Sequence, residues 1–138
     1  MSETRKALEA GIDIGRVEAL EVTLGAERLC ELVLLLRVRL RDAAARASVL
    51  APEAEAGLPG LLHQSRGSAG SLGLAAVSQA LSDLEIMVEG GALSDPMGRG
   101  ALVAAMRALD PLIEVALSIL AVRRAGGTGG HGGGAWKQ

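Results

Sequence analysis

The stretch "LCELVLLLRVRLRDAAARA", from Leu29 to Ala47, decides the fold class of this chain. Its apolar residues recur at alternating spacings of four and three, which is the pattern of a helix that buries one face against other helices. This stripe consists of Leu29, Val33, Leu36, Leu40, Ala43 and Ala47. We therefore expect a long helix that follows Gly25 and runs to about Ser48.

The composition extends this expectation to the whole chain. The 138 residues are 49% hydrophobic, but they include no Phe, no Tyr and a single Trp. The core must therefore consist of Leu, Val, Ile, Met and Ala, and straight-chain and small residues favour helix packing over sheet formation. The length suits one domain. We expect a single all-α domain.

Three further helices follow from similar patterns. One is expected at Pro59–Leu72, with Gly73 in the left-handed conformation that often ends a helix. The next is expected at Leu74–Val88, and the last has apolar residues at heptad spacing between Leu102 and Leu120. Four long helices joined by short connections predict an antiparallel four-helix bundle.

The two flanks of this bundle have weaker patterns. Residues Ser2–Glu21 predict an additional short N-terminal helix, whole or broken, that packs on one end of the bundle. The last helix is expected to end near Arg123 and Arg124, where basic residues suit the helix dipole. Pro111 lies inside this helix and is expected to kink it or to loosen one turn.

The C-terminal segment is expected to lie outside the domain. We assign residues 1–125 to the helical domain and the Gly-rich residues 126–138 to a flexible tail, which has too little apolar surface to order itself. Trp136 is expected to remain in solvent. His131 is interpreted as an incidental tail histidine, because no second metal ligand lies near it in the sequence.

Charge and composition exclude several classes of protein. The net charge is −2, so no basic surface for nucleic acid is expected. The longest apolar run, Leu32–Leu36, is far shorter than the roughly 20 residues of a membrane span. Cys30 is the only cysteine, and together with the missing signal peptide it favours a reducing compartment. We expect a monomeric cytoplasmic protein that binds neither nucleic acid nor membranes.

The candidate site lies in "LLHQSRGSAGSLG", from Leu61 to Gly73. At 100° per residue, His63, Arg66, Gly67 and Gly70 share one face of a helix, and the apolar residues gather on the opposite face. The histidine is therefore expected to point outward, with Arg66 placed to bind an anion on the imidazole. Each glycine costs about 1 kcal/mol in a helix interior, so we expect Gly67 and Gly70 to give a partner protein access.

Simpler explanations exist for each of these residues. A lone surface histidine often has no function, and Arg66 could be a solvated charge. Gly67 and Gly70 could be small residues that allow close packing between helices. A phosphate-binding loop is excluded because the segment lacks the spacing G-x-x-x-x-G-K-[ST] and no strand precedes it.

"HQSRGSAGSLG", with the downstream Leu81, Leu84 and Glu85, resembles the signature of histidine-containing phosphotransfer (HPt) domains, roughly H-x-x-K-G-S-A-x-x-L-G. The resemblance covers residues 12–89. It implies a phosphorelay intermediate in which His63 accepts a phosphoryl group from an aspartate of one receiver domain and passes it to an aspartate of another.

The resemblance also implies the roles of the neighbouring residues and the partners. Arg66 would stabilise the phosphoryl oxygens, and Gly67 and, less strictly, Gly70 would allow the receiver to approach. The chain would carry no cofactor, because the receiver supplies Mg²⁺, and it would have no kinase activity of its own. The partners would be response-regulator receiver domains and a hybrid histidine kinase. The chain departs from the family pattern at Ser65, usually apolar, and at Arg66, usually Lys.

A second function fits the same bundle. Leu34, Leu35 and Val38 are apolar but lie off the main stripe of their helix, and exposed apolar residues often mark a binding surface. The chain could therefore be an interaction module that binds receiver or kinase domains without relaying phosphate. Alternatively, the N-terminal helix covers these residues, which we expect. A metal-dependent bundle enzyme is disfavoured because no inward-facing Glu-x-x-His pairs are present.

Overall fold

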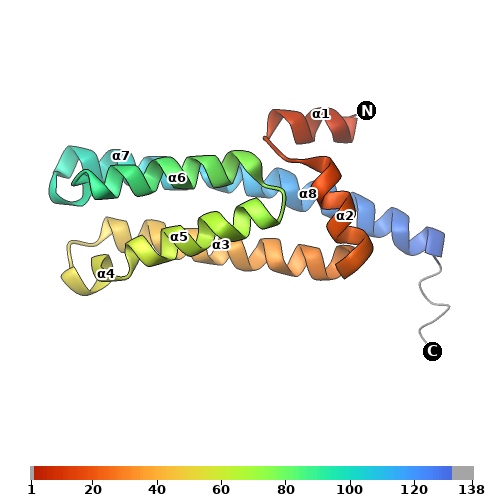
Figure 1. The fold of residues 1–138 in the computed structure, drawn as a ribbon, viewed down its shortest axis with the longest axis horizontal. Helices are drawn as coiled ribbons and strands as arrows, with labels where there is room; N and C mark the ends of the chain where they lie inside the picture. The colour runs from red at the N-terminus through yellow and green to blue at the C-terminus, as the bar shows by residue number, and fades with distance from the viewer. Residues whose placement is uncertain (1, 132–138) are drawn as a thin grey trace.

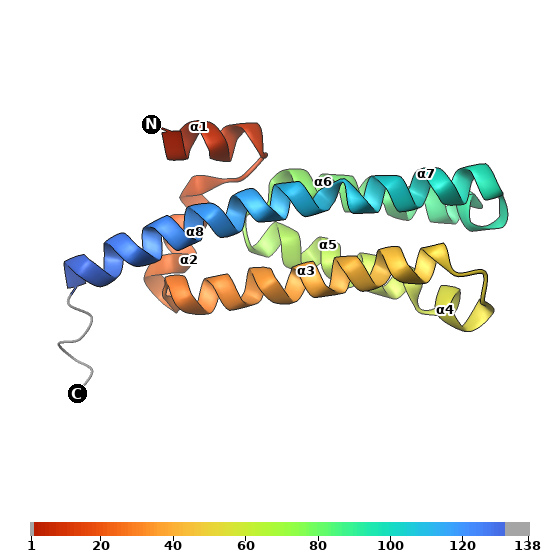
Figure 2. The same ribbon diagram turned by 180° about the vertical axis from the view of Figure 1, so that it is seen from behind.

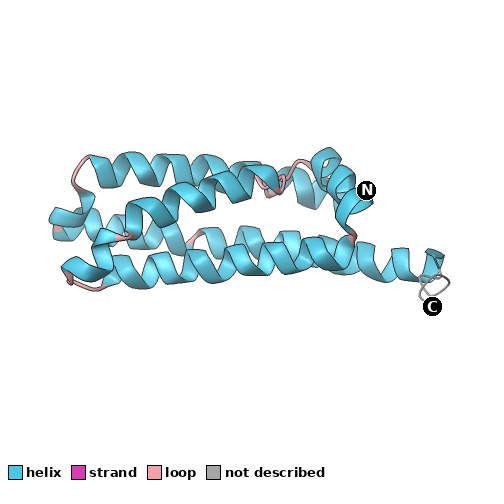
Figure 3. Cartoon of the chain, turned by 60° about the horizontal axis from the view of Figure 1, so that its bottom comes forward, coloured by secondary structure: helices cyan, strands magenta, loops and turns pink. Residues whose placement is uncertain are grey.

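The computed structural model describes residues 2–131, and these residues are helical apart from short connections (Figure 3). No strand occurs within this range. The prediction of an all-α protein is therefore confirmed. No helix of the described range is long and apolar enough to cross a lipid bilayer.

The N-terminal region forms two helices, α1 (Ser2–Glu9) and α2 (Ile14–Leu24). The break falls at Gly11, whose φ of +65° favours glycine. A side chain at Gly11 would also overlap Ala76, so the N-terminal region approaches the rest of the protein closely at this point. The Asp13 carboxylate then accepts a hydrogen bond from the Arg16 backbone N–H at 3.1 Å and so caps α2.

The long helix α3 (Ala26–Ser48) has the predicted limits. Every residue of the predicted stripe is buried, from Leu29 at its beginning to Ala47 at its end. The connection that follows contains a short helix that the apolar pattern does not predict, α4 (Pro52–Ala56). Its proline lies in the first turn, where a missing N–H costs nothing.

The next two helices also match the predictions closely. They are α5 (Leu58–Ser71) and α6 (Ala75–Glu89). Gly73 lies between them with a φ of +84°, which confirms the predicted left-handed conformation. A short 3₁₀ helix, η1 (Ala92–Ser94), follows α6.

The predicted last helix is divided into α7 (Pro96–Arg107) and α8 (Leu109–His131). Asp95 caps α7 by accepting a hydrogen bond from the Gly98 backbone N–H at 3.0 Å. Pro111 lies in the first turn of α8, where it has no N–H to donate to the carbonyl of Arg107. This missing bond explains why the helix is interrupted, so the expected loosening occurs at this point.

The end of α8 differs from the prediction. The helix continues to His131 instead of ending near Arg124, so it crosses the predicted boundary at residue 125. Glycine destabilises a helix mainly through the conformational entropy of the chain and not through steric hindrance. The Gly-rich composition therefore does not determine at which residue α8 ends. The expectation for Trp136 lies outside the described residues.

Helices α3, α5, α6 and the pair α7–α8 run side by side along the long axis, while α1 and α2 lie towards one end (Figures 1 and 2). Helix α5 packs on α6 and α3, and α3 also packs on α7 and α8. At the end of the molecule, α2 packs on α3 and α1 packs on α8.

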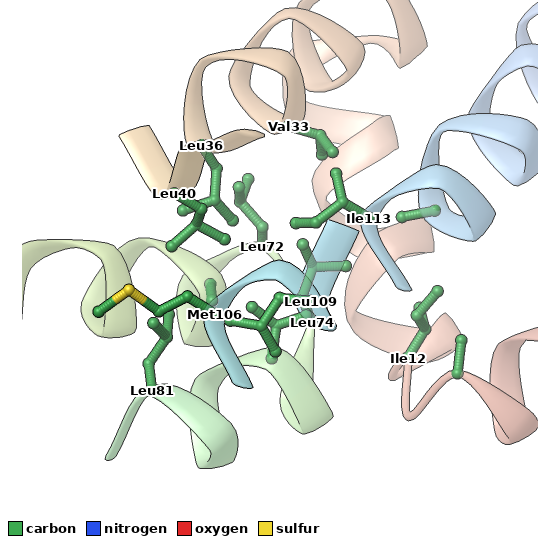
Figure 4. Close-up of a cluster of buried hydrophobic side chains, with 14 of the residues drawn as sticks. Ile12, Val33, Leu36, Leu40, Leu72, Leu74, Leu81, Met106, Leu109 and Ile113 are labelled. Atoms are coloured by element: carbon green, nitrogen blue, oxygen red, sulfur yellow. The ribbon is translucent and has the colours of Figure 1, made fainter. Parts of the chain in front are cut away.

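The core is aliphatic, as the composition requires. Figure 4 shows side chains of α3, α6, α7, α8 and the connection between α5 and α6 gathered together, with Met106 among branched aliphatic neighbours. Methionine adapts its shape to irregular gaps, which suits a core without aromatic rings. Ile12, from the segment between α1 and α2, closes one end of this cluster.

One buried charge joins four elements and was not foreseen from the sequence. Arg99 of α7 is only 9% exposed. Its guanidinium donates to the carbonyls of Ala47 at 2.8 Å, Val49 at 3.3 Å and Leu93 at 2.5 Å. It also pairs with the carboxylate of Glu55 in α4. Arg99 therefore satisfies carbonyls at the C-terminal end of α3.

Candidate functional site

Helix α5 presents the predicted site residues to solvent. It buries Leu58, Leu62, Ser65 and Ala69 on one side. On the other side the imidazole of His63 is 68% exposed, and Gly67 and Gly70 are also exposed. The predicted division of this helix into an inner and an outer face is confirmed.

A carboxylate from α6 meets His63. The Oε2 atom of Glu85 lies 3.3 Å from the Nδ1 atom of His63. Glu85 is only 17% exposed, so most of this side chain is shielded from solvent. The sequence does not predict this role, because Glu85 is only a downstream part of the family signature. Contact between α5 and α6 brings it to the site.

Arg66 lies beside the same two groups. Its Nη2 atom is 3.1 Å from Nδ1 of His63, and its Nη1 atom is 3.3 Å from Oε1 of Glu85. The spacing of three residues along α5 brings the arginine next to the histidine, as predicted. Arg66 is 36% exposed, so one side of its guanidinium remains open to an incoming anion.

The tautomer of the imidazole decides which of these contacts is a hydrogen bond. Nδ1 faces both an N–H donor of Arg66 and a carboxylate oxygen of Glu85, and it can serve only one of them at a time. Oε2 of Glu85 is buried and makes no hydrogen bond with other described groups. With the proton on Nε2, Nδ1 accepts a hydrogen bond from Arg66. With the proton on Nδ1, the ring N–H faces Oε2 of Glu85 at 3.3 Å. The lone pair of Nε2 is then free to act as a nucleophile.

The two glycines have different surroundings. No described atom outside the adjoining backbone lies within 4 Å of the position that a Cβ would take at Gly67. At Gly70 a Cβ would lie 3.4 Å from Oγ of Ser78 in α6. That hydroxyl donates to the carbonyl of Arg66 at 3.2 Å. Gly67 therefore leaves open space beside His63, whereas Gly70 faces the neighbouring helix, as the packing alternative expects.

An open groove of ≈ 620 Å³ lies between α3 and α5, and His63 is one of its lining residues. Its lining residues are Leu32, Leu35, Leu36, Arg39, His63, Gln64, Gly67, Ser68, Ser71 and Leu72. A partner that reached His63 from this side would meet both apolar and polar side chains.

The N-terminal helices do not cover the apolar residues of α3, contrary to our expectation. Leu34, Leu35 and Val38 are 40%, 46% and 63% exposed. Backbone hydrogen bonds hold the N-terminal segment elsewhere, against the turn between α5 and α6. The Asp13 N–H donates to the Gly73 carbonyl at 2.8 Å, and the Ala76 N–H donates to the Gly11 carbonyl at 2.9 Å.

Ser65 is fully buried, and its hydroxyl has no hydrogen-bond partner among the described atoms. It makes no bond back to the carbonyl of Leu61, four residues earlier. Within the described residues, no three His, Cys, Asp or Glu side chains gather as metal ligands.

Comparison of this chain with protein-family models, curated proteins and solved structures finds no match.

Proposed function

We propose that this protein is a phosphorelay intermediate. In this proposal His63 accepts a phosphoryl group from an aspartate of one receiver domain and transfers it to an aspartate of another. We further propose that α3, α5, α6 and the pair α7–α8 form an antiparallel four-helix bundle of the HPt type, with α1 and α2 as the N-terminal addition. The protein would act as a monomer in the cytoplasm.

The observation that supports this proposal best is the arrangement around one exposed imidazole. His63 is 68% exposed, and a buried carboxylate lies 3.3 Å from its Nδ1 atom. We infer that the reactive tautomer has its proton on Nδ1, facing this carboxylate, which leaves Nε2 unprotonated, as a nucleophile requires. A histidine without function on the surface needs no such partner.

The proposed transfer proceeds in line. The lone pair of Nε2 attacks the phosphorus of an aspartyl phosphate, the P–N bond forms, and the P–O bond to the aspartate breaks. The aspartate leaves as a carboxylate with the bonding electrons. The imidazole, still protonated on Nδ1, gains positive charge, which the carboxylate of Glu85 stabilises. Transfer to the second receiver follows the same steps in reverse.

Neighbouring residues supply positioning and charge. Arg66 lies 3.1 Å from the ring, where its free N–H groups can bind phosphoryl oxygens. Gly67 leaves room for the receiver to bring its aspartate up to Nε2, and Gly70 contributes less to this access. Mg²⁺ would be held by the receiver's own carboxylates, since phosphoryl transfer depends mainly on positioning and charge neutralisation.

Phosphoryl transfer tests this proposal directly. Receiver domains are labelled on their aspartate with acetyl [³²P]phosphate and Mg²⁺, purified and mixed with the protein. We expect label to move to the protein in a form that is stable to alkali and labile to acid, as a phosphohistidine is. The variant H63Q should take up none, whereas H131Q, which removes the only other histidine, should behave as wild type. Equal labelling of H63Q and wild type would contradict the proposal.

The interaction module remains the second candidate, because Leu34, Leu35 and Val38 are exposed and could bind a partner. In that case a receiver would bind to wild type and to H63Q with equal affinity, and no label would move in either direction. A hybrid histidine kinase could bind to the same surface.

A further inference from the structure

One arginine side chain, that of Arg39, lines the groove between α3 and α5. Arg39 is the only charged residue in its lining apart from a titratable histidine, and no carboxylate lines it. The remaining lining residues are apolar or neutral. The groove is therefore suited to a surface that combines apolar side chains with negative charge.

Arg39 differs from the arginines that flank it in α3. Residues two positions apart in a helix point in nearly opposite directions, so Arg37 and Arg41 face α8 instead of the groove. Arg37 pairs with Glu114 at 2.6 Å, and Arg41 pairs with Asp110 at 2.9 Å. No hydrogen bond or ion pair joins Arg39 to another described residue. Its charge is therefore available to a partner.

The charge of Arg66, in contrast, is already engaged. Its guanidinium lies 3.3 Å from the carboxylate of Glu85, which neutralises part of its charge. A negatively charged partner that approached His63 across the groove would therefore be attracted mainly by Arg39, since the field of a paired charge falls off faster with distance.

We propose that Arg39 is the electrostatic docking contact for the receiver, an inference that rests on the proposed function. A receiver must surround its phosphoryl-accepting aspartate with further carboxylates, because Mg²⁺ is held by carboxylate oxygens. These carboxylates give its active face the negative charge that Arg39 complements. Arg39 accelerates the association of the two proteins and takes no part in the chemical step.

The test compares two phosphoryl donors. Phosphoramidate is a small donor: its P–N bond breaks, ammonia leaves, and the phosphoryl group forms a P–N bond with Nε2. It needs no docking surface. We expect R39Q and wild type to react with phosphoramidate at equal rates. With the labelled receiver that transfers fastest to wild type, R39Q should show a second-order rate constant lower by about fivefold, and its rate should depend less on salt.

The variant R28Q is the matched control. Arg28 lies on the same helix but pairs with Glu31 at 3.1 Å, and it does not line the groove. R28Q changes the net charge by the same amount, so a nonspecific charge effect would slow both variants equally. We expect R28Q to react as wild type with both donors, and R39E to be slower than R39Q with the receiver alone.

The outcomes separate the two proposals. If phosphoramidate and receivers both label His63 but R39Q and R28Q behave alike, the docking role of Arg39 is wrong and the relay function stands. If R39Q loses rate with phosphoramidate as well, Arg39 acts in the chemistry or in the fold, and the docking role is again wrong. If neither donor, or only phosphoramidate, labels His63, the relay proposal itself fails.

Discussion

At the scale of single residues, the site depends on what surrounds one imidazole. The partner of Nδ1 decides which ring nitrogen carries the proton, and an absent side chain at Gly67 decides what can approach the other nitrogen. These two features are independent, because Glu85 belongs to α6 and Gly67 belongs to α5. They therefore support separate predictions.

The variant G67A separates access from stability. Its methyl group meets no described atom within 4 Å, so the helix should gain about 1 kcal/mol in unfolding free energy, measured by urea denaturation. Transfer from a receiver should fall by about tenfold or more, since small misplacements of reacting groups are costly. G100A is the control: Gly100 in α7 is equally open, so that variant should gain similar stability and keep its transfer rate. Unchanged transfer in G67A would refute the access role.

The variant E85A tests the orientation of the ring. Removing the carboxylate should leave the N–H of Arg66, 3.1 Å from Nδ1, without a competitor at that nitrogen, which favours the proton on Nε2 and blocks the nucleophile. We expect ¹⁵N NMR at neutral pH to show the Nδ1–H tautomer in wild type and a shift towards Nε2–H in E85A. Reaction with phosphoramidate should slow by about tenfold to a hundredfold, as when a carboxylate that orients a metal-bound histidine is lost. E89A, at the exposed end of the same helix, should change neither; identical tautomers in E85A and wild type would contradict this role.

At the scale of helices, long-range polar contacts hold elements that the apolar pattern does not join. Arg99 connects α7 to the end of α3, to α4 and to η1. Arg41 connects α3 to α8 through two hydrogen bonds to Asp110, each 2.9 Å long. Such contacts have no period in the sequence, so no pattern predicts them.

Arg99 is expected to contribute strongly to stability. The variant R99M fills similar space but removes the guanidinium that pairs with the Glu55 carboxylate and donates to three backbone carbonyls. We expect a loss of about 3 kcal/mol in unfolding free energy, as when one partner of a buried charge pair is removed. R107M, a control on the same helix, removes an exposed arginine with a single 3.5 Å contact to Ser48, and it should lose far less. Equal losses in the two variants would contradict the role of Arg99.

The junction of α3 and α8 predicts how stability depends on pH. Hydrogen bonds from Arg41 hold the pKa of the Asp110 carboxyl below its ordinary value. Its contribution is therefore complete above the unfolded pKa of about 3.9 and is lost as the pH falls through the lower folded pKa. In acid titrations of thermal stability, D110N should start lower at neutral pH and lose less on acidification. D83N, whose carboxylate accepts from Gln79, should keep the wild-type slope; a wild-type slope in D110N would argue against this contribution.

At the scale of the whole molecule, the sequence predicts the features that depend on the periodic burial of apolar side chains along a helix. The stripe of α3, the inner and outer faces of α5, and the left-handed Gly73 follow from local patterns and appear in the structure. The covering of Leu34 was predicted wrongly, because backbone contacts at Gly11 and Gly73 hold the N-terminal helices elsewhere.

The candidate site was predictable only in part, for the same physical reason. His63, Arg66 and Gly67 lie within one turn of one helix, so a helical projection places them together. Glu85 lies on the next helix and reaches the imidazole through tertiary packing. Arg39 reaches the groove from a third helix. To predict which residues of two helices meet, the register of their packing must be known. That register depends on every side chain in the contact.

The central claim is that Nε2 of His63 carries the phosphoryl group. The most direct measurement is NMR of the ¹⁵N-labelled protein after reaction with a phosphorylated receiver, in which ³¹P–¹⁵N coupling identifies the bonded nitrogen. We predict one phosphohistidine, with phosphorus bonded to Nε2 of His63 and a proton on Nδ1. Phosphorus on Nδ1, on His131 or on no histidine at all would contradict the account.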